Sequence, residues 1–208
     1  MKRNEERPLV FSSNEGNAPP LDEVELVRRA KEDPEAFGLL YERYVTRVYR
    51  YFFYRTGDVQ DAEDLTARTF YRILKHLPRY QERGLPFSAW VYRIAHNVVA
   101  NWLRDRSRHP VVGLESLRGI PTPEGDLIAR LEEREEQEAL IQAIRRLPPD
   151  RQELLYLKFV EEMSNAEIGA ILGRSEGAIK SLYHRTLVEL RRQLRGEEED
   201  EPLGNPCP

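Results

Sequence analysis

Residues 164–190, SNAEIGAILGRSEGAIKSLYHRTLVEL, have the pattern of two helices joined by a tight turn. Gly169 permits the close approach that such a pair requires, and Gly173 suits the left-handed conformation that closes the turn. Ser164 is a candidate N-cap, and Glu167 follows it with the spacing of a capping box. The apolar residues that would hold the second helix against the first are Ile168, Leu172, Ile179 and Leu182. This stretch therefore predicts a helix-turn-helix.

The second helix of this motif would expose basic and polar side chains on one face. In helix-turn-helix proteins the N-terminal part of that helix enters the major groove of DNA. Lysine and arginine side chains there contact guanine edges or phosphates, and serine and histidine do either. We therefore predict DNA contacts by six residues, which are Ser175, Glu176, Lys180, Ser181, His184 and Arg185. The alternative is a helical hairpin whose basic surface has no nucleic-acid partner.

The rest of the chain also has helical periodicity, and no segment of useful length has the period of a strand. Asp33-Pro34 supplies an N-cap and a first-turn proline, and Gly57 ends the helix that follows. The expected apolar face of that helix is Phe37, Leu40, Tyr41, Tyr44 and Val48. Two further helices are expected to bury Leu65, Thr69, Ile73 and Leu77, and then Phe87, Val91, Ile94, Val98 and Trp102. We predict an all-α fold with two small helical domains.

Charge divides the chain into blocks, although the net charge is only −4. Residues 24–110 hold 16 basic and 11 acidic side chains, residues 111–140 hold 3 and 8, and residues 141–195 hold 10 and 7. Two basic modules joined by an acidic connector predict two anion-binding domains, although solvated helix faces would give the same counts. The predicted segments are a disordered arm (1–22), a first helical domain (23–109), an acidic flexible linker (110–135), a second helical domain (136–195) and an acidic disordered tail (196–208).

The helix predicted from Phe87 to about Arg106 has a polar stripe opposite its apolar face. The members of the stripe recur every three or four residues and are Arg93, Asn97, Asn101, Arg104 and Arg108. Trp90 lies near the stripe, and the preceding loop contributes Tyr80. Arginine, amide and aromatic groups together suit single-stranded DNA, because bases stack on the rings while arginine holds phosphates. The alternatives are that the rings are core, that the stripe only faces solvent, and that Asn97 is a buried structural amide.

In their order along the chain, these motifs resemble an extracytoplasmic-function sigma factor, the small type of bacterial RNA polymerase initiation factor with only regions two and four. The resemblance covers about residues 24–195 and rests on LLYERY, DAEDLTARTFYRIL, FSAWVYRIAHNVVANWLR and the segment from LPPDRQELLYLKFV through the helix-turn-helix. It implies a factor that binds core RNA polymerase at the β′ clamp and the β flap and recognises promoter DNA. It also implies inhibition by a separate anti-sigma factor, with no enzymatic activity and no cofactor.

The resemblance implies a polymerase-binding role for four residues, which are Asp61, Glu63, Asp64 and Arg68. The three acids would also be favourable as helix N-terminal charges, so a structural role is not exclusive. Many relatives have Gln-Glu where this chain has Ala67-Arg68. Arg68 is therefore expected either to weaken the polymerase contact or to meet a compensating acid on the partner.

The resemblance also implies roles at the promoter. Asn97 matches the position that receives a flipped base of the minus-ten element, and Tyr80 matches the aromatic site of the specificity loop. The residues expected at this element are Tyr80, Trp90, Arg93, Asn97, Asn101 and Arg104. The second helix of the helix-turn-helix is expected to read the minus-thirty-five element.

Other classes of protein have little support in the sequence. It has no glycine-rich phosphate loop and no H-E-x-x-H, its four histidines are scattered, and its one cysteine is Cys207. An enzyme, a metal site and a disulfide framework are therefore not expected. The chain lacks an apolar run of about 20 residues and a signal peptide, so we expect a cytoplasmic protein with no membrane insertion. A stand-alone helix-turn-helix regulator, binding operator DNA without polymerase, is the alternative function.

Overall fold

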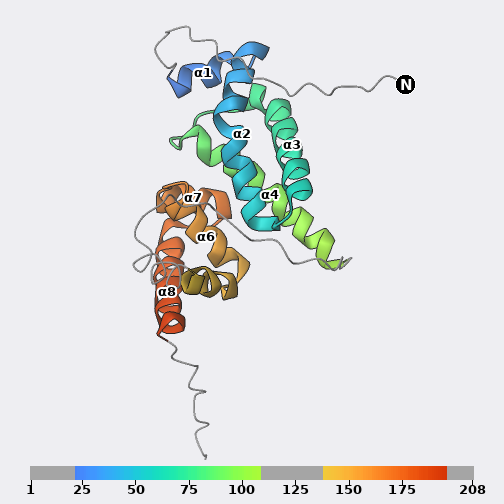
Figure 1. Cartoon of the computed structure of the whole chain (residues 1–208). Helices are drawn as coiled ribbons and strands as arrows, with labels where there is room; N and C mark the ends of the chain where they lie inside the picture. The colour runs from blue at the N-terminus through green and yellow to red at the C-terminus, as the bar shows by residue number, and fades with distance from the viewer. Residues whose placement is uncertain (1–21, 109–137, 196–208) are drawn as a thin grey trace, which may run out of the picture.

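The computed structural model describes residues 22–108 and 138–195, which form helices joined by turns (Figure 1). The N-terminal bundle comprises α1 (Glu23–Arg29), α2 (Pro34–Thr56), α3 (Val59–His76), the 3-10 turn η1 (Leu77–Arg79) and α4 (Phe87–Arg108). The C-terminal bundle comprises a helical stretch over residues 138–146, α6 (Pro149–Phe159), α7 (Asn165–Leu172) and α8 (Glu176–Leu194). These described ranges contain no strand, so the all-α prediction is confirmed. The predicted arm up to residue 21, the linker and the tail lie outside them, and the exact segment boundaries stay predictions.

Local capping signals fix the ends of α2 and α3. The Asp33 carboxylate accepts a hydrogen bond of 2.9 Å from an amide of the first turn, and Pro34 is the first helical residue. Gly57 ends α2 with a φ of 69°, a left-handed conformation that favours glycine. Asp58 then caps α3 by accepting a hydrogen bond of 2.9 Å from the Asp61 amide. These short-range contacts explain why the helix ends could be predicted from the sequence.

The apolar faces of α2, α3 and α4 meet in the core of the N-terminal bundle. The predicted core residues that are buried are Leu40, Tyr44, Val48, Leu65, Thr69, Ile73, Leu77, Phe87, Val91 and Val98. Ile94 and Trp102 are only partly buried. The predicted face of α2 is wrong at Tyr41, which is 43% exposed and packs edge-on against Phe70. The buried face continues instead to Tyr51 and Phe52.

The predicted helix-turn-helix is confirmed. Ser164 and Glu167 form a reciprocal capping box, with hydrogen bonds of 2.6 and 3.3 Å. Gly173 ends α7 with a φ of 66°. Gly169 lies against the turn, where an added β-carbon would stand 2.6 Å from the carbonyl oxygen of Arg174. Ile168, Ile179 and Leu182 are buried as predicted, whereas Leu172 is partly buried.

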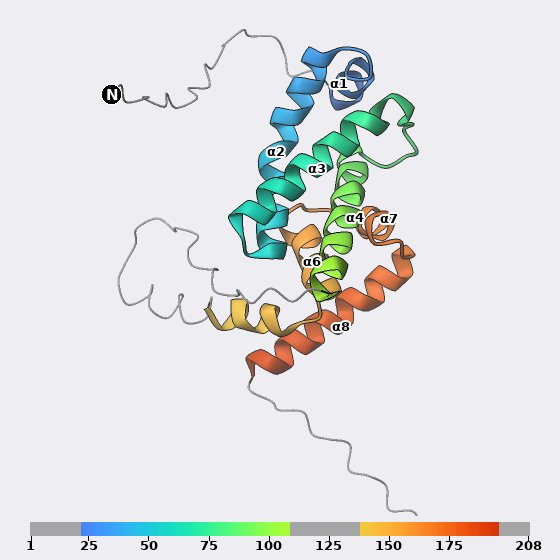
Figure 2. The same ribbon diagram turned by 90° about the vertical axis from the view of Figure 1, so that its right-hand side faces the viewer.

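The two bundles pack together, with α7 beside α4 (Figure 2). One cluster of buried apolar side chains includes Tyr92 and Val99 of α4 together with Leu157 of α6 and Ile168 of α7. A second, smaller cluster joins residues 138–146 to α6 and α8 and consists of Ala143, Leu147, Leu155 and Leu190. The sequence pattern predicted the two domains but not the apolar contact between them.

Replacing Gly169 by alanine should lower the free energy of unfolding by about 1–3 kcal/mol, because the new β-carbon meets backbone rather than a movable side chain. Gly177, in α8, is a matched control because a β-carbon there meets open space. Gly177→Ala should leave stability unchanged or raise it by about 0.5–1 kcal/mol, since alanine is the better helix former. Urea unfolding followed by circular dichroism measures both. A Gly169→Ala chain as stable as the wild type would contradict the close approach.

Candidate nucleic-acid interface

The N-terminal half of α8 presents a polar face to solvent. All six residues predicted to contact DNA are exposed, namely Ser175, Glu176, Lys180, Ser181, His184 and Arg185. Lys180 Nζ lies 2.8 Å from Glu176 Oε1, and Arg185 Nε donates a hydrogen bond of 3.4 Å to the Ser181 carbonyl. Exposed pairs of this kind are weak, so phosphates or base edges can replace them. The structure therefore gathers these side chains on one accessible surface.

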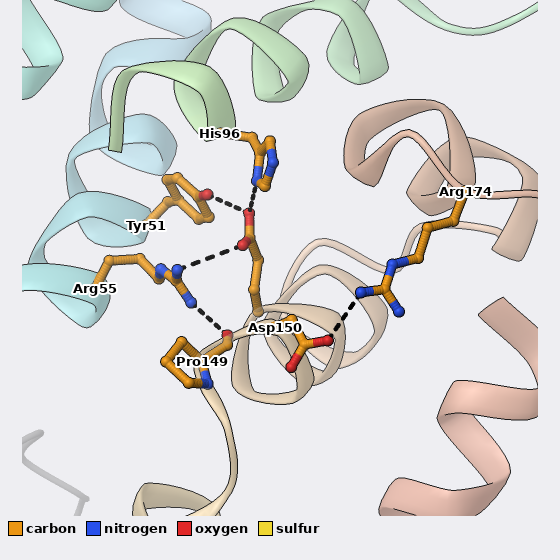
Figure 3. A network of polar contacts seen from close by, with 7 residues as sticks. Tyr51, Arg55, His96, Pro149, Asp150 and Arg174 are labelled. Atoms are coloured by element: carbon orange, nitrogen blue, oxygen red, sulfur yellow. Dashed lines mark hydrogen bonds and ion pairs between the residues drawn. The ribbon is translucent and has the colours of Figure 1, made fainter. Parts of the chain in front are cut away.

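Arg174, in the turn before α8, is an exposed basic residue next to the start of this helix that the sequence reasoning missed. It is exposed, and its guanidinium lies 3.0 Å from the carboxylate of Asp150 at the start of α6 (Figure 3). Arginine side chains and helix N-termini are common phosphate contacts. Its place one residue before the N-cap Ser175 is the signal that could have identified it.

The polar stripe of α4 is also accessible. Arg93, Asn97, Asn101 and Arg104 are all exposed, on the side of the helix away from the buried Val91 and Val98. Because Asn97 is exposed, the reading of this residue as a buried structural amide is wrong. The fifth predicted member, Arg108, ends the helix, and its side chain lies outside the described residues. Amide and guanidinium groups thus form one continuous surface strip.

The aromatic residues near this stripe divide into two groups. Tyr80, Phe87 and Trp90 form a cluster with ring centroids 4.8–5.3 Å apart, and Tyr80 and Trp90 are half-buried. Tyr92 is fully buried and cannot reach a nucleic acid from the surface. Trp90 therefore supports the ring of Tyr80 from the side of α4, while both side chains stay partly exposed.

The loop that carries Tyr80 is held from the opposite side by α1. Lys31, just after α1, donates a hydrogen bond of 2.8 Å from Nζ to the Tyr80 carbonyl, and the same nitrogen lies 5.9 Å from the ring centroid. A hollow of about 410 Å³ lies between α1, this loop and the start of α4. Burial raises the pKa of the Tyr80 hydroxyl, and the charge of Glu82 raises it further, so the hydroxyl is neutral at physiological pH. No local sequence signal connects Lys31 to Tyr80.

The acidic residues of α3 form a second accessible surface. Glu63 and Asp64 are exposed, and Asp61 is partly buried in the first turn. Arg68 Nη2 lies 2.8 Å from Asp64 Oδ2, one helical turn away. The chain itself therefore supplies an acid that pairs with the unusual arginine.

Apolar side chains accompany these acids. Tyr71 is 67% exposed and Leu74 is 51% exposed, both on α3. A hollow of about 360 Å³ between α2 and α3 is lined by residues that include Tyr41, Tyr49 and Ala67. Exposed apolar groups beside charges are typical of a protein-binding surface. Helical periodicity predicts the buried stripe of α3, but it gives no signal for this exposed apolar part, which the sequence reasoning missed.

Neither a metal-binding cluster nor a membrane-spanning helix is present within residues 22–108 and 138–195. No group of three or more histidine, cysteine, aspartate or glutamate side chains there is placed to hold a metal ion. None of the helices in these ranges is both long enough and apolar enough to cross a membrane.

Comparison with known proteins assigns both bundles. Residues 40–109 match the family described as Sigma-70 region 2, and residues 137–190 match Sigma-70, region 4. The N-terminal bundle thus contains region 2, with α1 upstream of the matched residues, and the C-terminal bundle contains region 4.

The chain is 39% identical over 176 residues to the ECF RNA polymerase sigma factor BldN of Streptomyces coelicolor, and the aligned segment covers 82% of this chain and 65% of BldN. It is 30% identical over 178 residues to the ECF RNA polymerase sigma factor SigW of Bacillus subtilis, and this aligned segment covers 79% of this chain and 92% of SigW. The sigma factor RpoE of Bartonella quintana, solved with the anti-sigma factor NepR, has a similar fold, with a TM-score of 0.61 at 22% identity over 79% of this chain and 99% of that one. The chain contains regions 2 and 4 in this order, and it matches SigW over nearly the whole length of SigW. It therefore belongs to the extracytoplasmic-function sigma factors of the sigma-70 family.

Proposed function

We propose that this chain is a promoter-specificity subunit that binds core RNA polymerase and directs promoter recognition and opening. The observation that carries the proposal is the presence of two exposed polar and basic faces, one at the start of α8 and one along α4. They lie in the two parts of the chain that match region 4 and region 2. A stand-alone regulator would need only the first face. Members of this family are initiation factors rather than enzymes.

At the minus-thirty-five element, α8 would enter the major groove with its N-terminal half. Lys180 and Arg185 are the candidates for guanine edges or phosphates, and Arg174 is a candidate for a phosphate at the start of the helix. The predicted polymerase partner of region 4 is the β flap. The exposed apolar residues Phe159 and Val188 of the C-terminal bundle are suited to a protein contact.

At the minus-ten element, the α4 stripe and the Tyr80 loop would hold opened DNA. The amide of Asn97 can both donate to and accept from an extruded base, and it is accessible. Arg93 and Arg104 flank it along the helix and suit phosphates. The half-buried ring of Tyr80 is partly accessible to a base, while Lys31 fixes the backbone of that residue.

Core polymerase would bind α3 through the β′ clamp. Glu63 and Asp64 provide exposed negative charge, and Tyr71 and Leu74 provide apolar area on the same helix. We further propose a cytoplasmic location, because core polymerase acts there, and regulation by a separate anti-sigma factor. The complex of the structurally similar RpoE with NepR supports the second of these.

Run-off transcription with core polymerase tests the proposal most simply. The template is the DNA upstream of the gene for this chain, and gel-shift assays on the same DNA run in parallel. Transcripts of one defined length should require both the chain and core polymerase. Tight sequence-specific binding by the chain alone, without transcripts when polymerase is present, would instead identify a stand-alone regulator.

Lys180→Ala and Arg185→Ala should each weaken promoter binding by the polymerase complex by about 1–3 kcal/mol if the side chain reads a base. Affinity is measured by gel shift on the matched promoter and on variants of its minus-thirty-five element. Arg191→Ala is the control, because this exposed arginine of α8 lies outside the predicted contact set. If neither Lys180→Ala nor Arg185→Ala alters affinity or base preference, the assignment of the recognition face is wrong.

Asn97→Ala should impair promoter opening more than closed-complex formation. Extruding a base costs a few kcal/mol of stacking and pairing, and the amide would repay part of this only after extrusion. Permanganate reactivity of unpaired thymines reports opening, and a gel shift reports binding. His76→Ala, at an exposed position outside the predicted surfaces, should change neither. Full opening by the Asn97→Ala chain would show that Asn97 contacts no flipped base.

Asp64→Asn should weaken binding to core polymerase, whereas Arg68→Gln should strengthen it or leave it unchanged, because the second change frees the Asp64 carboxylate. Both sites are exposed, so stability should change by less than about 0.5 kcal/mol. Glu42→Gln, on α2, is a control that removes one exposed acid elsewhere. Fluorescence anisotropy of the labelled chain measures affinity. Equal affinities for the Asp64→Asn and Glu42→Gln chains would move the docking surface away from Asp64.

A further inference from the structure

The loop between α3 and α4 starts at Tyr80 and lies next to α1 (Figure 2). Residues 81–84 of this loop are exposed. Lys31, just after α1, donates a hydrogen bond of 2.8 Å from Nζ to the Tyr80 carbonyl, across 49 residues of sequence. Hydrogen bonds from a charged donor are stronger than those between neutral groups. The first residue of an exposed loop is therefore tied to a second element of the bundle.

The position of Lys31 is itself set by the packing of α1 on α2. The two amides that follow Lys31 donate hydrogen bonds of 3.1 and 3.0 Å to the Arg29 carbonyl, so the chain makes a tight turn there. At the other end of α1, the Tyr44 hydroxyl of α2 donates a hydrogen bond of 2.5 Å to Glu23 Oε1. The apolar side chains that anchor this segment in the core are Leu26, Val27 and Ala30. Because the turn is part of the packed bundle, Lys31 offers the loop a fixed point of attachment.

The ring of Tyr80 lies between the Lys31 ammonium and two aromatic residues of α4. Its centroid is 5.9 Å from Lys31 Nζ, 5.2 Å from the ring centroid of Phe87 and 4.8 Å from that of Trp90. A cation at this distance is weakly attracted to a ring, and edge-on packing of the kind made with Phe87 is a favourable aromatic geometry. The carbonyl bond fixes the backbone of Tyr80 while these contacts fix its side chain. The ring therefore has one defined place on the surface.

Lys31 differs from the basic residues that are candidates for phosphate contacts. Its side chain is half-buried and its ammonium is engaged with the loop, whereas Arg93 and Arg104 are exposed along α4. Arg28 lines the same hollow of about 410 Å³ as Lys31, but it is exposed and pairs with Glu25 at 2.6 Å. One cation of the hollow thus contacts the loop and the other contacts its own helix. Arg28 is therefore a matched comparison for Lys31.

We propose that Lys31 is a positioning residue that sets the place of the Tyr80 ring and, through this ring, the base preference of the chain at the minus-ten element. The inference rests on the proposed function, in which Tyr80 contacts opened DNA. Lys31 acts on the loop and not on the DNA. Because Lys31 precedes residues 40–109, which match region 2, a residue outside the matched segment completes the site.

Fluorescence quenching of Trp90 tests the positioning without polymerase or DNA. The sequence has two tryptophans, so Trp102→Phe leaves Trp90 as the only one. In this background, Lys31→Met should make Trp90 about twofold more accessible to acrylamide, because a charged hydrogen bond that holds Tyr80 against it is lost. Lys31→Arg keeps a charged donor and should restore part of the protection, and Arg28→Met should leave quenching unchanged. Unchanged quenching in a folded Lys31→Met chain would overturn the proposal.

Circular dichroism shows whether each of these chains keeps its helices. If the Lys31→Met chain loses them, the Lys31→Gln chain decides, because its neutral and shorter side chain keeps a polar end in the half-buried position.

Transcription from promoters altered at single minus-ten positions tests the consequence. Base preference is the ratio of transcript from the matched template to transcript from an altered one, and a gel shift measures the closed complex. Lys31→Met should lower this ratio by about fivefold at one position and leave closed-complex affinity within about twofold of the wild type. Arg28→Met should change neither. A loss of transcript that is equal on all templates would show a merely structural role for Lys31 and overturn the proposal.

A double variant shows whether Lys31 acts through Tyr80. In the Tyr80→Ala chain, Lys31→Met should lower base preference no further, because the ring that Lys31 positions is already absent. Losses that multiply, together with a salt dependence of binding reduced by about one phosphate contact, would identify Lys31 as a direct DNA contact and overturn the proposal.

The two kinds of assay separate failure of this inference from failure of the proposed function. A Tyr80→Ala chain with the base preference of the wild type would overturn the promoter contact of Tyr80 and the consequence proposed for Lys31, whereas the quenching result would still stand. If Tyr80→Ala loses base preference while Lys31→Met changes neither quenching nor preference, the positioning by Lys31 is wrong and the proposed function is intact.

Discussion

The burial of Glu153 is the constraint on which the arrangement of the two bundles depends. A charged group leaves water only where donors and opposite charges replace its hydration. Glu153 finds these on α2 and α4 rather than on its own bundle. The apolar cluster that runs through both bundles supplies area of contact but little direction, because hydrophobic burial is non-directional. The carboxylate contacts select one orientation of α6 from those that the apolar surfaces would allow.

Contacts of α6 also position the candidate DNA-binding surface. Asp150, three residues before Glu153, pairs with Arg174 in the turn of the helix-turn-helix. The close approach of Gly169 to the same turn then fixes α7 against α8. In the N-terminal bundle, His96 contacts Glu153 while its neighbour Asn97 faces solvent in the stripe. The interface between the bundles and the two candidate promoter surfaces are therefore built on adjacent residues of the same helices.

How far the sequence predicts the molecule depends on the distance between interacting residues. Helix ends and the helix-turn-helix were predictable, because Asp33, Ser164 and Gly173 act within one turn of their own position. The exposed stripe of α4 was predictable for the same reason, since helical periodicity places its members on one face. The partners of Glu153 were not, because His96 and Tyr51 lie 57 and 102 residues away and a glutamate in a polar helix is expected in solvent. The link from Lys31 to Tyr80, across 49 residues, has no local sequence signal either. Arg68, by contrast, pairs with Asp64 one helical turn away, at a spacing that is visible in the sequence.

The contacts of Glu153 with α2 and α4 set how the two bundles lie against each other. Single-molecule energy transfer in the full chain measures this arrangement most directly. In a Cys207→Ser background, dyes are attached at the exposed positions Lys75→Cys on α3 and Arg191→Cys on α8. Glu153→Gln should broaden the transfer distribution or shift it to lower values, because the partners of the buried charge are lost, while circular dichroism shows that the helices are kept. Glu162→Gln, which removes an exposed acid nearby, should leave the distribution unchanged. Unchanged transfer in a folded Glu153→Gln chain would contradict this role of Glu153.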